Sequence, residues 1–166
     1  MSDAEFTISR LTSSDTTRLR ELNRLFARAF EDPENYSKSP PSDDYLRGWL
    51  GQDHVIVLVA SRETELVGGL VAYELQKFEQ ERREIYLYDL GVESKFRRRG
   101  VATMLIDALR KTAQARGAFV VFVQADQGDD PAISLYSKLG KREEVLHFDF
   151  AVEKPPPSTK NVQGSD

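Results

Sequence analysis

The stretch EIYLYDLGVESKFRRRGVATMLIDALRKTAQARGAFVVFV, residues 84–123, carries the strongest indication of the fold. Glu84–Val92 is rich in β-branched and aromatic residues and predicts a strand. Val101–Ala115 has apolar residues at helical spacing, and Arg116-Gly117 ends this predicted helix. Phe119–Val123 predicts a second, buried strand. A strand, a crossover helix and a strand in this order predict two parallel strands within one sheet.

Further strands and helices are predicted on both sides of this unit. Phe6–Leu11 alternates and predicts a first strand. Val55–Ala60 is a β-branched run typical of a strand covered on both faces, and together with Leu66–Leu75 it predicts a hairpin. Val145–Phe150 alternates and predicts the last strand. The other predicted elements are a helix that ends near Asp32, a loop at Glu34–Pro41, a helix that Ser42 caps, and a helix over Ala132–Leu139.

The composition excludes several classes of protein. With 23 basic and 27 acidic residues the net charge is −4, so no extended basic surface for nucleic acid is expected. The chain has no cysteine, which excludes disulfides, thiolate metal sites and a covalent thioester intermediate on the protein. No metal-ligand spacing appears, and no apolar run approaches the ~20 residues of a membrane span. We expect a cytoplasmic protein with one domain over residues 1–152 and a flexible, proline-rich tail over residues 153–166.

Three arginines precede the predicted helix, in the sequence FRRRGVA at Phe96–Ala102. A helix start offers unpaired backbone N–H groups and the positive end of the dipole, and Gly100 would let a phosphate approach the backbone closely. One alternative is a solvated basic face, although basic side chains are unfavourable at a helix N-terminus. The other is a patch for nucleic acid, which the acidic surroundings disfavour. Because neither a P-loop nor a dinucleotide fingerprint is present, we expect another kind of anion-binding loop.

Two motifs resemble those of a known family. Arg97-x-x-Gly100-x-Ala102 matches the [QR]-x-x-G-x-[GA] loop with which the GCN5-related N-acetyltransferases, the GNAT superfamily, bind the pyrophosphate of acyl-CoA. LYSKLG at Leu135–Gly140 resembles the second motif of that family, whose tyrosine lies near the sulfur of coenzyme A. Further similarity, from about residue 36 to residue 149, is to the type I aminoglycoside 3-N-acetyltransferases, or gentamicin acetyltransferases. It rests on KFEQ (77–80), EIYLYDLGV (84–92), VQADQGDDPA (123–132) and REEVLHFDF (142–150), with Gly91 where alanine is expected.

The resemblance implies a fold and a cofactor. The GNAT fold is an α/β fold with a mixed, mostly antiparallel, twisted sheet of about six or seven strands, a splayed central parallel pair and about four helices. The cofactor is acetyl-CoA, and a homodimer is expected because dimers are frequent in the family. In that family the strand before the arginine loop bulges, and its free backbone groups hold the pantetheine arm and polarise the thioester carbonyl. Carried over by position, the cofactor-binding residues are Leu90, Gly91, Val92, Arg97, Arg98, Arg99, Gly100, Val101, Ala102, Thr103 and Tyr136.

The resemblance also implies direct acetyl transfer to an amine in a ternary complex. This reaction needs a base for the amine and an acid for the departing thiolate. Asp89 is the candidate base, because an unpaired carboxylate in an apolar strand is costly, and its alternative roles are an internal hydrogen-bond acceptor or a strand-end cap. Glu84 is the alternative base. Tyr136 is the candidate acid, and a satisfied core tyrosine is its alternative role.

Acidic residues are the candidates for holding the acceptor, because aminoglycosides are polycations. Several of these residues follow the strand that ends at Val123, and ligands gather at such strand ends in α/β sheets. The candidate substrate-binding residues are Glu84, Asp126, Asp129, Asp130 and Asp149. Simple solvation of these carboxylates is the alternative, and Asp130 is also placed to cap a helix.

The sequence therefore predicts an enzyme that acetylates the 3-amino group of a small cationic aminoglycoside and confers resistance to it. Two rival functions remain. One is a GNAT enzyme that acetylates another polyamine, a peptide or a protein amine. The other is a non-catalytic module that binds acyl-CoA.

Overall fold

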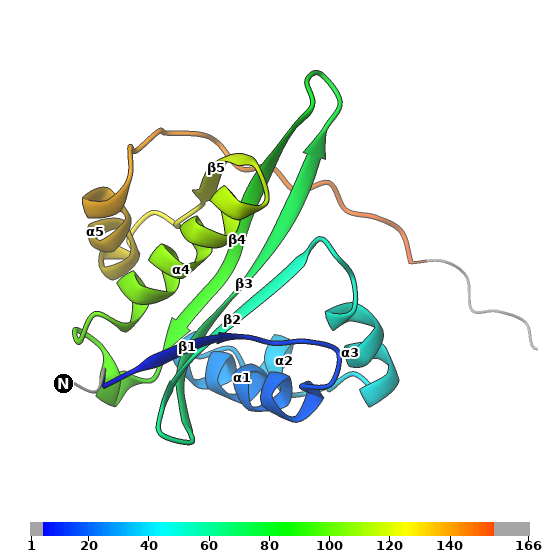
Figure 1. Ribbon diagram of the computed structural model, residues 1–166, viewed down its shortest axis with the longest axis vertical. Helices are drawn as coiled ribbons and strands as arrows, with labels where there is room; N and C mark the ends of the chain where they lie inside the picture. Colours follow the sequence, from blue (N-terminus) through cyan, green and yellow to red (C-terminus); the bar gives the residue numbers. More distant parts are fainter. Residues whose placement is uncertain (1–4, 155–166) are drawn as a thin grey trace, which may run out of the picture. The chain divides into compact units, whose positions relative to one another are not determined.

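The computed structural model describes residues 5–154 and divides the chain into two compact units, of which the first ends at Asp130 and the second begins at Pro131 (Figure 1). The first unit holds one sheet with the strand order β1-β2-β3-β4-β5. The strands are β1 (Thr7–Arg10), β2 (Val55–Arg62), β3 (Glu65–Lys77), β4 (Arg82–Val92) and β5 (Ala118–Val123). Neighbouring strands are antiparallel except β4 and β5, which are parallel. The predicted mixed sheet, the hairpin and the parallel pair are confirmed.

Helices connect these strands. Those of the first unit are α1 (Thr16–Ala29), α2 (Pro33–Tyr36), α3 (Asp43–Leu50) and α4 (Val101–Ala115), with a 3-10 turn at Ser94–Phe96. The second unit holds α5 (Asp130–Leu139), apart from the first residue of that helix. The apolar spacing that predicted α4 is the spacing of its buried side chains, which include Leu105 and Leu109. Within residues 5–154, every helix is too short or too polar to cross a lipid bilayer.

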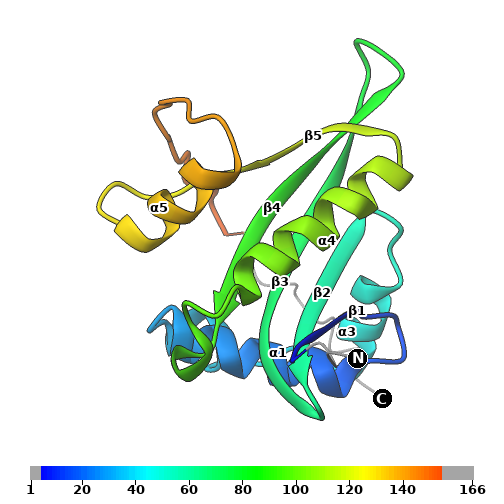
Figure 2. The same cartoon turned by 60° about the vertical axis from the view of Figure 1, so that its left-hand side comes forward.

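α1 and α4 cover opposite faces of the sheet (Figure 2). Leu22 of α1 approaches β3 at Gly69, whereas Val101 of α4 approaches the same strand at Gly68. Adjacent residues of a strand point to opposite faces, so the two helices lie on opposite sides. Leu22 is fully buried, and burying a side chain of this size contributes roughly 1.5–3 kcal/mol to stability.

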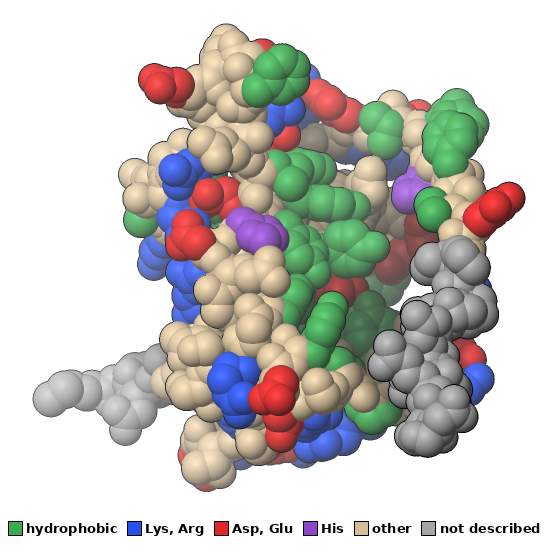
Figure 3. All heavy atoms as spheres, turned by 90° about the vertical axis from the view of Figure 1, so that its right-hand side faces the viewer, with side chains coloured by type: hydrophobic (Ala, Val, Ile, Leu, Met, Phe, Trp, Pro, Cys, Tyr) green, Lys and Arg blue, Asp and Glu red, His purple; other side chains and the backbone are tan. Residues whose placement is uncertain are grey.

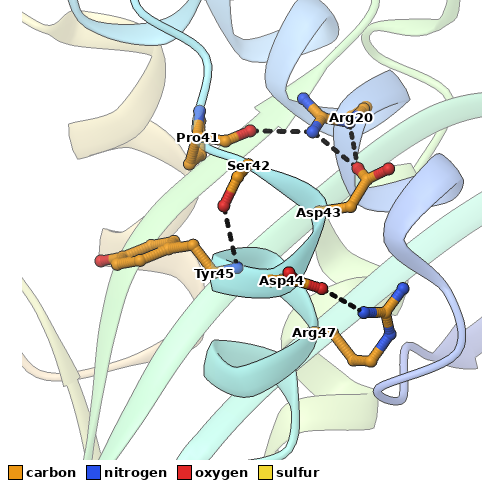
Figure 4. A network of polar contacts seen from close by, with 7 residues as sticks. All are labelled: Arg20, Pro41, Ser42, Asp43, Asp44, Tyr45 and Arg47. Atoms are coloured by element: carbon orange, nitrogen blue, oxygen red, sulfur yellow. Dashed lines mark hydrogen bonds and ion pairs between the residues drawn. The ribbon is translucent and has the colours of Figure 1, made fainter.

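Polar contacts join the N-terminus of α3 to α1 (Figure 4). Ser42 Oγ accepts a hydrogen bond from the backbone N–H of Tyr45 at 3.2 Å, which confirms the predicted cap. Arg20 of α1 donates to the carbonyl oxygen of Pro41 at 2.8 Å and to Oδ1 of Asp43 at 2.6 Å. These contacts fix the chain shortly after α2.

The structure corrects two of the predicted elements. The predicted strand at Val145–Phe150 is wrong, and the described residues contain five strands rather than six or seven. Alternation indicates which side chains share a face, but a strand also needs a hydrogen-bonded neighbour, and none of the described strands pairs with this segment. The predicted loop at Glu34–Pro41 overlaps α2, which forms because Asp32 caps it and Pro33 fits its first position. Residues 155–166, most of the predicted tail, lie outside the described residues.

Candidate active site

A β-bulge in β4 shapes the backbone at Asp89. Val71 of β3 pairs with Asp89, but the next residue, Ala72, pairs with Leu87, so Tyr88 is the extra residue of β4. A bulge of this kind bends the strand and redirects its side chains. The bulge that the family resemblance predicts in this strand is therefore present, directly before Asp89.

The same strand runs on beyond its parallel neighbour. The ladder between β4 and β5 ends where Leu87 is level with Val123, whereas β4 continues to Val92. Within the described part of the chain, residues 88–92 therefore have no strand partner on the side of β5. This is the separation expected of the splayed parallel pair.

The backbone groups of this strand end alternate between its two edges. The Glu93 N–H donates to the carbonyl oxygen of Val67 in β3 at 2.9 Å. In an antiparallel ladder every second residue bonds the partner, so Gly91 also faces β3, whereas Leu90 and Val92 direct their N–H and C=O groups to the other edge, where the Val92 carbonyl oxygen accepts from Arg97 Nε at 3.2 Å. Of the three backbones predicted to hold the pantetheine arm, two therefore lie along the free edge of β4, Leu90 with both backbone groups and Val92 with its N–H.

Asp89 accepts a hydrogen bond from Tyr36, whose hydroxyl oxygen lies 2.6 Å from Oδ1. Tyr36 is the last residue of α2, and the Asp32 side chain caps that helix by accepting a backbone N–H of its first turn. The Tyr36 ring packs edge-on against Phe26 and Phe30 of the α1 end, with centroids 5.8 and 5.4 Å away. A short capped helix and two rings therefore fix the hydroxyl that meets the carboxylate.

The environment of Asp89 changes its acidity. The side chain is half-buried, and no lysine, arginine or histidine among residues 5–154 forms an ion pair with it. Burial raises the pKa of Asp89 above its ordinary value, and the hydrogen bond from Tyr36 opposes this rise. Burial, and then the hydrogen bond to Asp89, raise the pKa of the Tyr36 hydroxyl, so that it remains a donor at neutral pH. The structure shows Asp89 as an acceptor for Tyr36, and its role as a base stays a prediction.

Three tyrosines that the sequence did not single out share the face of Asp89. Val71 and Tyr73 lie on one face of β3, so their partners Asp89 and Tyr86 lie on one face of β4. The Tyr88 ring contacts those of Tyr73 and Tyr86, with centroids 5.9 and 5.4 Å away. Burial raises the pKa of Tyr73 and of Tyr86, and the negative charge of Asp89 adds to both shifts. Strict alternation along β4 would have put Tyr86 and Tyr88 on the face opposite Asp89, and although the family resemblance predicted a bulge in this strand, it did not give the bulge's exact position.

Tyr88 is also among the exposed apolar residues, with 61% of its surface accessible. Figure 3 shows hydrophobic side chains gathered in the middle of the face that it draws, with acidic side chains among and around them. Rings of this kind bind both the apolar faces of sugars and the charge of ammonium groups.

The three arginines of the loop after β4 differ in their partners. Arg97 donates to the backbone carbonyl oxygens of Val92 and Ala29, at 3.2 and 3.3 Å. Arg99 pairs with Glu5 and lies over the ring of Phe6, 5.5 Å from its centroid. Arg98 has no ion pair or hydrogen bond among the described residues. Of the three guanidinium groups, that of Arg98 is free to bind an anion.

The backbone at the start of α4 also fits an anion. Gly100 is the N-cap with a φ of 83°, a left-handed conformation that suits glycine, and no side chain caps the helix. Met104 makes the first helical hydrogen bond, to the Gly100 carbonyl oxygen at 2.9 Å. The N–H groups of the first turn, at Val101, Ala102 and Thr103, therefore have no helical acceptor and lie at the positive end of the dipole.

The predicted acidic residues of the first unit have different surroundings. Glu84 is on the same face of β4 as the tyrosines, with 21% of its side chain accessible, and lies 3.8 Å from Lys77 Nζ. Asp126, Asp129 and Asp130 are exposed and follow β5. The N–H of Asp129 donates to the Asp126 carbonyl oxygen at 3.2 Å, which makes a turn. The structure brings Glu84 to the face of Asp89, and the role of the other three stays a prediction.

Two predicted residues belong to the second unit. Tyr136 lies on α5, the helix that the sequence predicted there. Asp149 lies in the extended segment that follows, and its Oδ1 is hydrogen-bonded to His147 Nε2 at 2.9 Å. Their roles as acid and as substrate ligand stay predictions.

Comparison with known proteins agrees with this geometry. Residues 19–141 match the family model described as the acetyltransferase (GNAT) family. An acetyltransferase of Pectobacterium atrosepticum, ECA0875, is 32% identical over 106 residues, which are 58% of this chain and 71% of that protein. The chain therefore belongs to the GNAT family of acetyltransferases.

Within this family, some of the most similar solved structures are aminoglycoside acetyltransferases. The aminoglycoside acetyltransferase HMB0005, from an uncultured soil metagenomic sample, is 49% identical with a TM-score of 0.89, over 90% of this chain and 100% of that one. The aminoglycoside acetyltransferase meta-AAC0020, also from such a sample and solved in complex with sisomicin, is 33% identical with a TM-score of 0.84, over 90% and 97%. This acetyltransferase is thus structurally close to enzymes that modify aminoglycosides.

The cofactor of the family suits the residues present. GNAT acetyltransferases use acetyl-CoA, and so does this chain. Its pyrophosphate is an anion, and the uncapped start of α4 and the free Arg98 guanidinium are groups that bind anions. Its pantetheine arm carries amides, and the unpaired edge of β4 offers donors and acceptors for amides.

Proposed function

We propose that this enzyme acetylates the 3-amino group of 2-deoxystreptamine aminoglycosides of the gentamicin type, and so confers resistance to them. One observation carries the proposal. Asp89, a half-buried carboxylate without a basic partner in the described residues, lies at a bulge beside the unpaired edge of β4. A carboxylate so placed is costly for stability, and it is suited to remove a proton from an amine bound next to that edge.

Each group has a role in a direct transfer within a ternary complex. Acetyl-CoA, when bound, supplies the acetyl group as a thioester. Arg98 and the first N–H groups of α4 hold its pyrophosphate, and the free edge at Leu90 and Val92 holds the pantetheine arm and polarises the carbonyl. Asp89 takes a proton from the acceptor ammonium, so that the neutral amine attacks the carbonyl carbon and the C–S bond breaks. Tyr136 donates a proton to the departing thiolate, and the proton that the attacking nitrogen loses as the amide forms restores the Tyr136 hydroxyl.

The acidic side chains of the protein support an aminoglycoside as the acceptor. An aminoglycoside carries several ammonium groups, which carboxylates attract and aromatic faces also bind. Glu84 and the tyrosines on the face of Asp89 would meet the ring that reacts. The proposed ligands of the other ammonium groups are Asp126, Asp129 and Asp130 in the first unit, and Asp149 in the second unit is proposed separately as a substrate ligand.

A thiol-release assay with acetyl-CoA tests the function. Gentamicin, kanamycin, spermidine and lysine peptides are compared as acceptors, and NMR of the product identifies the nitrogen that is acetylated. We expect turnover with gentamicin at the 3-amino group, and raised resistance of a susceptible bacterium that expresses the protein. Turnover of spermidine or peptides without any aminoglycoside would contradict the assignment, and thermal stabilisation by coenzyme A without turnover of any amine would indicate a binding module.

The role of Asp89 is tested by Asp89→Asn. We expect kcat to fall about 100-fold or more, because the amide cannot accept the proton, with little change in the affinity for coenzyme A. Asp107→Asn is a matched control, since Asp107 is an exposed residue of α4 paired only with Arg110 at 3.6 Å among the described residues. Unchanged turnover in Asp89→Asn would remove this residue from the mechanism.

A further inference from the structure

The only hydrogen bond to the Asp89 carboxylate within residues 5–154 comes from Tyr36, at Oδ1. Oδ2 has no partner there. Tyr36 lies far away in sequence, on a four-residue helix in which no side chain is fully buried. Its hydroxyl nevertheless reaches Asp89 at 2.6 Å, because the rings of Phe26 and Phe30 hold it from the other side.

We infer that Tyr36 is a positioning residue for the base: its hydroxyl holds Oδ1 of Asp89 and thereby leaves Oδ2 to take the proton from the acceptor amine. The inference rests on the proposed function for the identity of the base. The contact of Tyr36 with Asp89 does not depend on which amine is acetylated.

A hydrogen bond that donates to the carboxylate stabilises its ionised form, which is the form that accepts a proton. The other titratable groups near Asp89 are Tyr73 on β3 and Tyr86 on β4, whose pKa values burial raises, with the ring of Tyr88 in contact with both. Besides Asp89 itself, the negative charge of Asp32 on the α2 cap also raises the pKa of the Tyr36 hydroxyl. Burial raises the pKa of Asp89, and among the described residues no basic group counteracts this rise. The hydrogen bond from Tyr36 is therefore the one contact there that favours the ionised carboxylate.

The variant Tyr36→Phe removes the hydroxyl and keeps the ring that packs on Phe26 and Phe30. The pKa of Asp89 is measured in the free protein by NMR of ¹³C-labelled aspartate, with the signal assigned by its loss in Asp89→Asn. Since hydrogen bonds to charged groups contribute measurably to ionisation, we expect the Asp89 titration to move to higher pH by about 1 in Tyr36→Phe. This measurement needs no acceptor and no turnover.

Kinetics give a second readout that lost packing alone would not change. In Tyr36→Phe the acidic limb of the kcat/KM profile should move to higher pH by about the same amount, so that activity falls roughly fivefold at the pH of the wild-type midpoint and recovers at higher pH. A purely structural role predicts a fall of the same factor at every pH. Tyr45→Phe is the matched control, because the Tyr45 ring is 64% exposed and its hydroxyl has no hydrogen bond among the described residues.

The outcomes separate the two proposals. An Asp89 titration that is the same in Tyr36→Phe and wild type would overturn the inference, whatever the acceptor. An inactive Asp89→Asn together with an unshifted profile in Tyr36→Phe would also overturn it while leaving the proposed function in place. If the enzyme acetylates no aminoglycoside, the proposed function fails, and the NMR titration still decides the inference.

Discussion

A methyl group added at Gly91 tests the packing behind Asp89. A Cβ at this position would lie 2.9 Å from Cδ1 and 3.1 Å from Cε1 of Phe26, closer than carbon atoms normally approach. The Phe26 ring is 2% exposed and stacks on Phe30 at 5.0 Å, so it has little room to move. Overpacking of this kind costs roughly 1–3 kcal/mol, and we expect Gly91→Ala to lose that much unfolding free energy in urea denaturation.

The same substitution elsewhere in the chain provides the control. Gly48 in α3 has nothing within 4 Å of an added Cβ, so Gly48→Ala should stabilise the protein by roughly 0.5–1 kcal/mol through helix propensity. In a double-mutant cycle, Gly91→Ala should cost less when Phe26 is already leucine, because the smaller side chain yields. Equal stability of Gly91→Ala and wild type would refute the steric argument, and so would a cost that Phe26→Leu does not reduce.

Two further predictions concern the arginines. Arg98→Ala should raise the KM for acetyl-CoA roughly 5- to 30-fold, about 1–2 kcal/mol, and most clearly at low salt. Arg99→Ala should leave that KM unchanged and lower thermal stability slightly, because Arg99 forms an ion pair with Glu5. A larger rise of the KM in Arg99→Ala than in Arg98→Ala would show that Arg98 does not reach the phosphates. Arg116→Met should destabilise the protein by roughly 2–3 kcal/mol in urea denaturation. The reason is that Glu74, whose side chain is 7% exposed, would keep only Arg83 as a basic partner among the described residues. A loss below ~0.5 kcal/mol would contradict this prediction.

Much of the fold could be predicted because its signals are local. The apolar spacing of Val101–Ala115 and the β-branched run from Val55 predicted α4 and β2 where the structure has them. Val145–Phe150 was predicted wrongly because a strand depends on a neighbour that periodicity does not specify.

The candidate site could be predicted only in part for the same reason. Asp89 and the arginine loop are adjacent in sequence and carry a motif, so their place was predictable. Tyr36 was missed because its partner lies 53 residues away, and the tyrosines of β4 were missed because the bulge changes which side chains share a face. The burial that changes the pKa of Asp89 likewise exists only in the folded chain.

The bulge, the free strand edge and the start of α4 occupy one uninterrupted segment between Tyr88 and Thr103. An insertion or a shift of register within this segment would displace the Asp89 carboxylate and the groups proposed to bind acetyl-CoA at the same time. A lineage that changes its acceptor while keeping the same acyl donor must therefore vary residues outside this segment. The short helix α2 and the face of β3 satisfy that condition, and natural diversity in acceptor preference among such enzymes should be concentrated there.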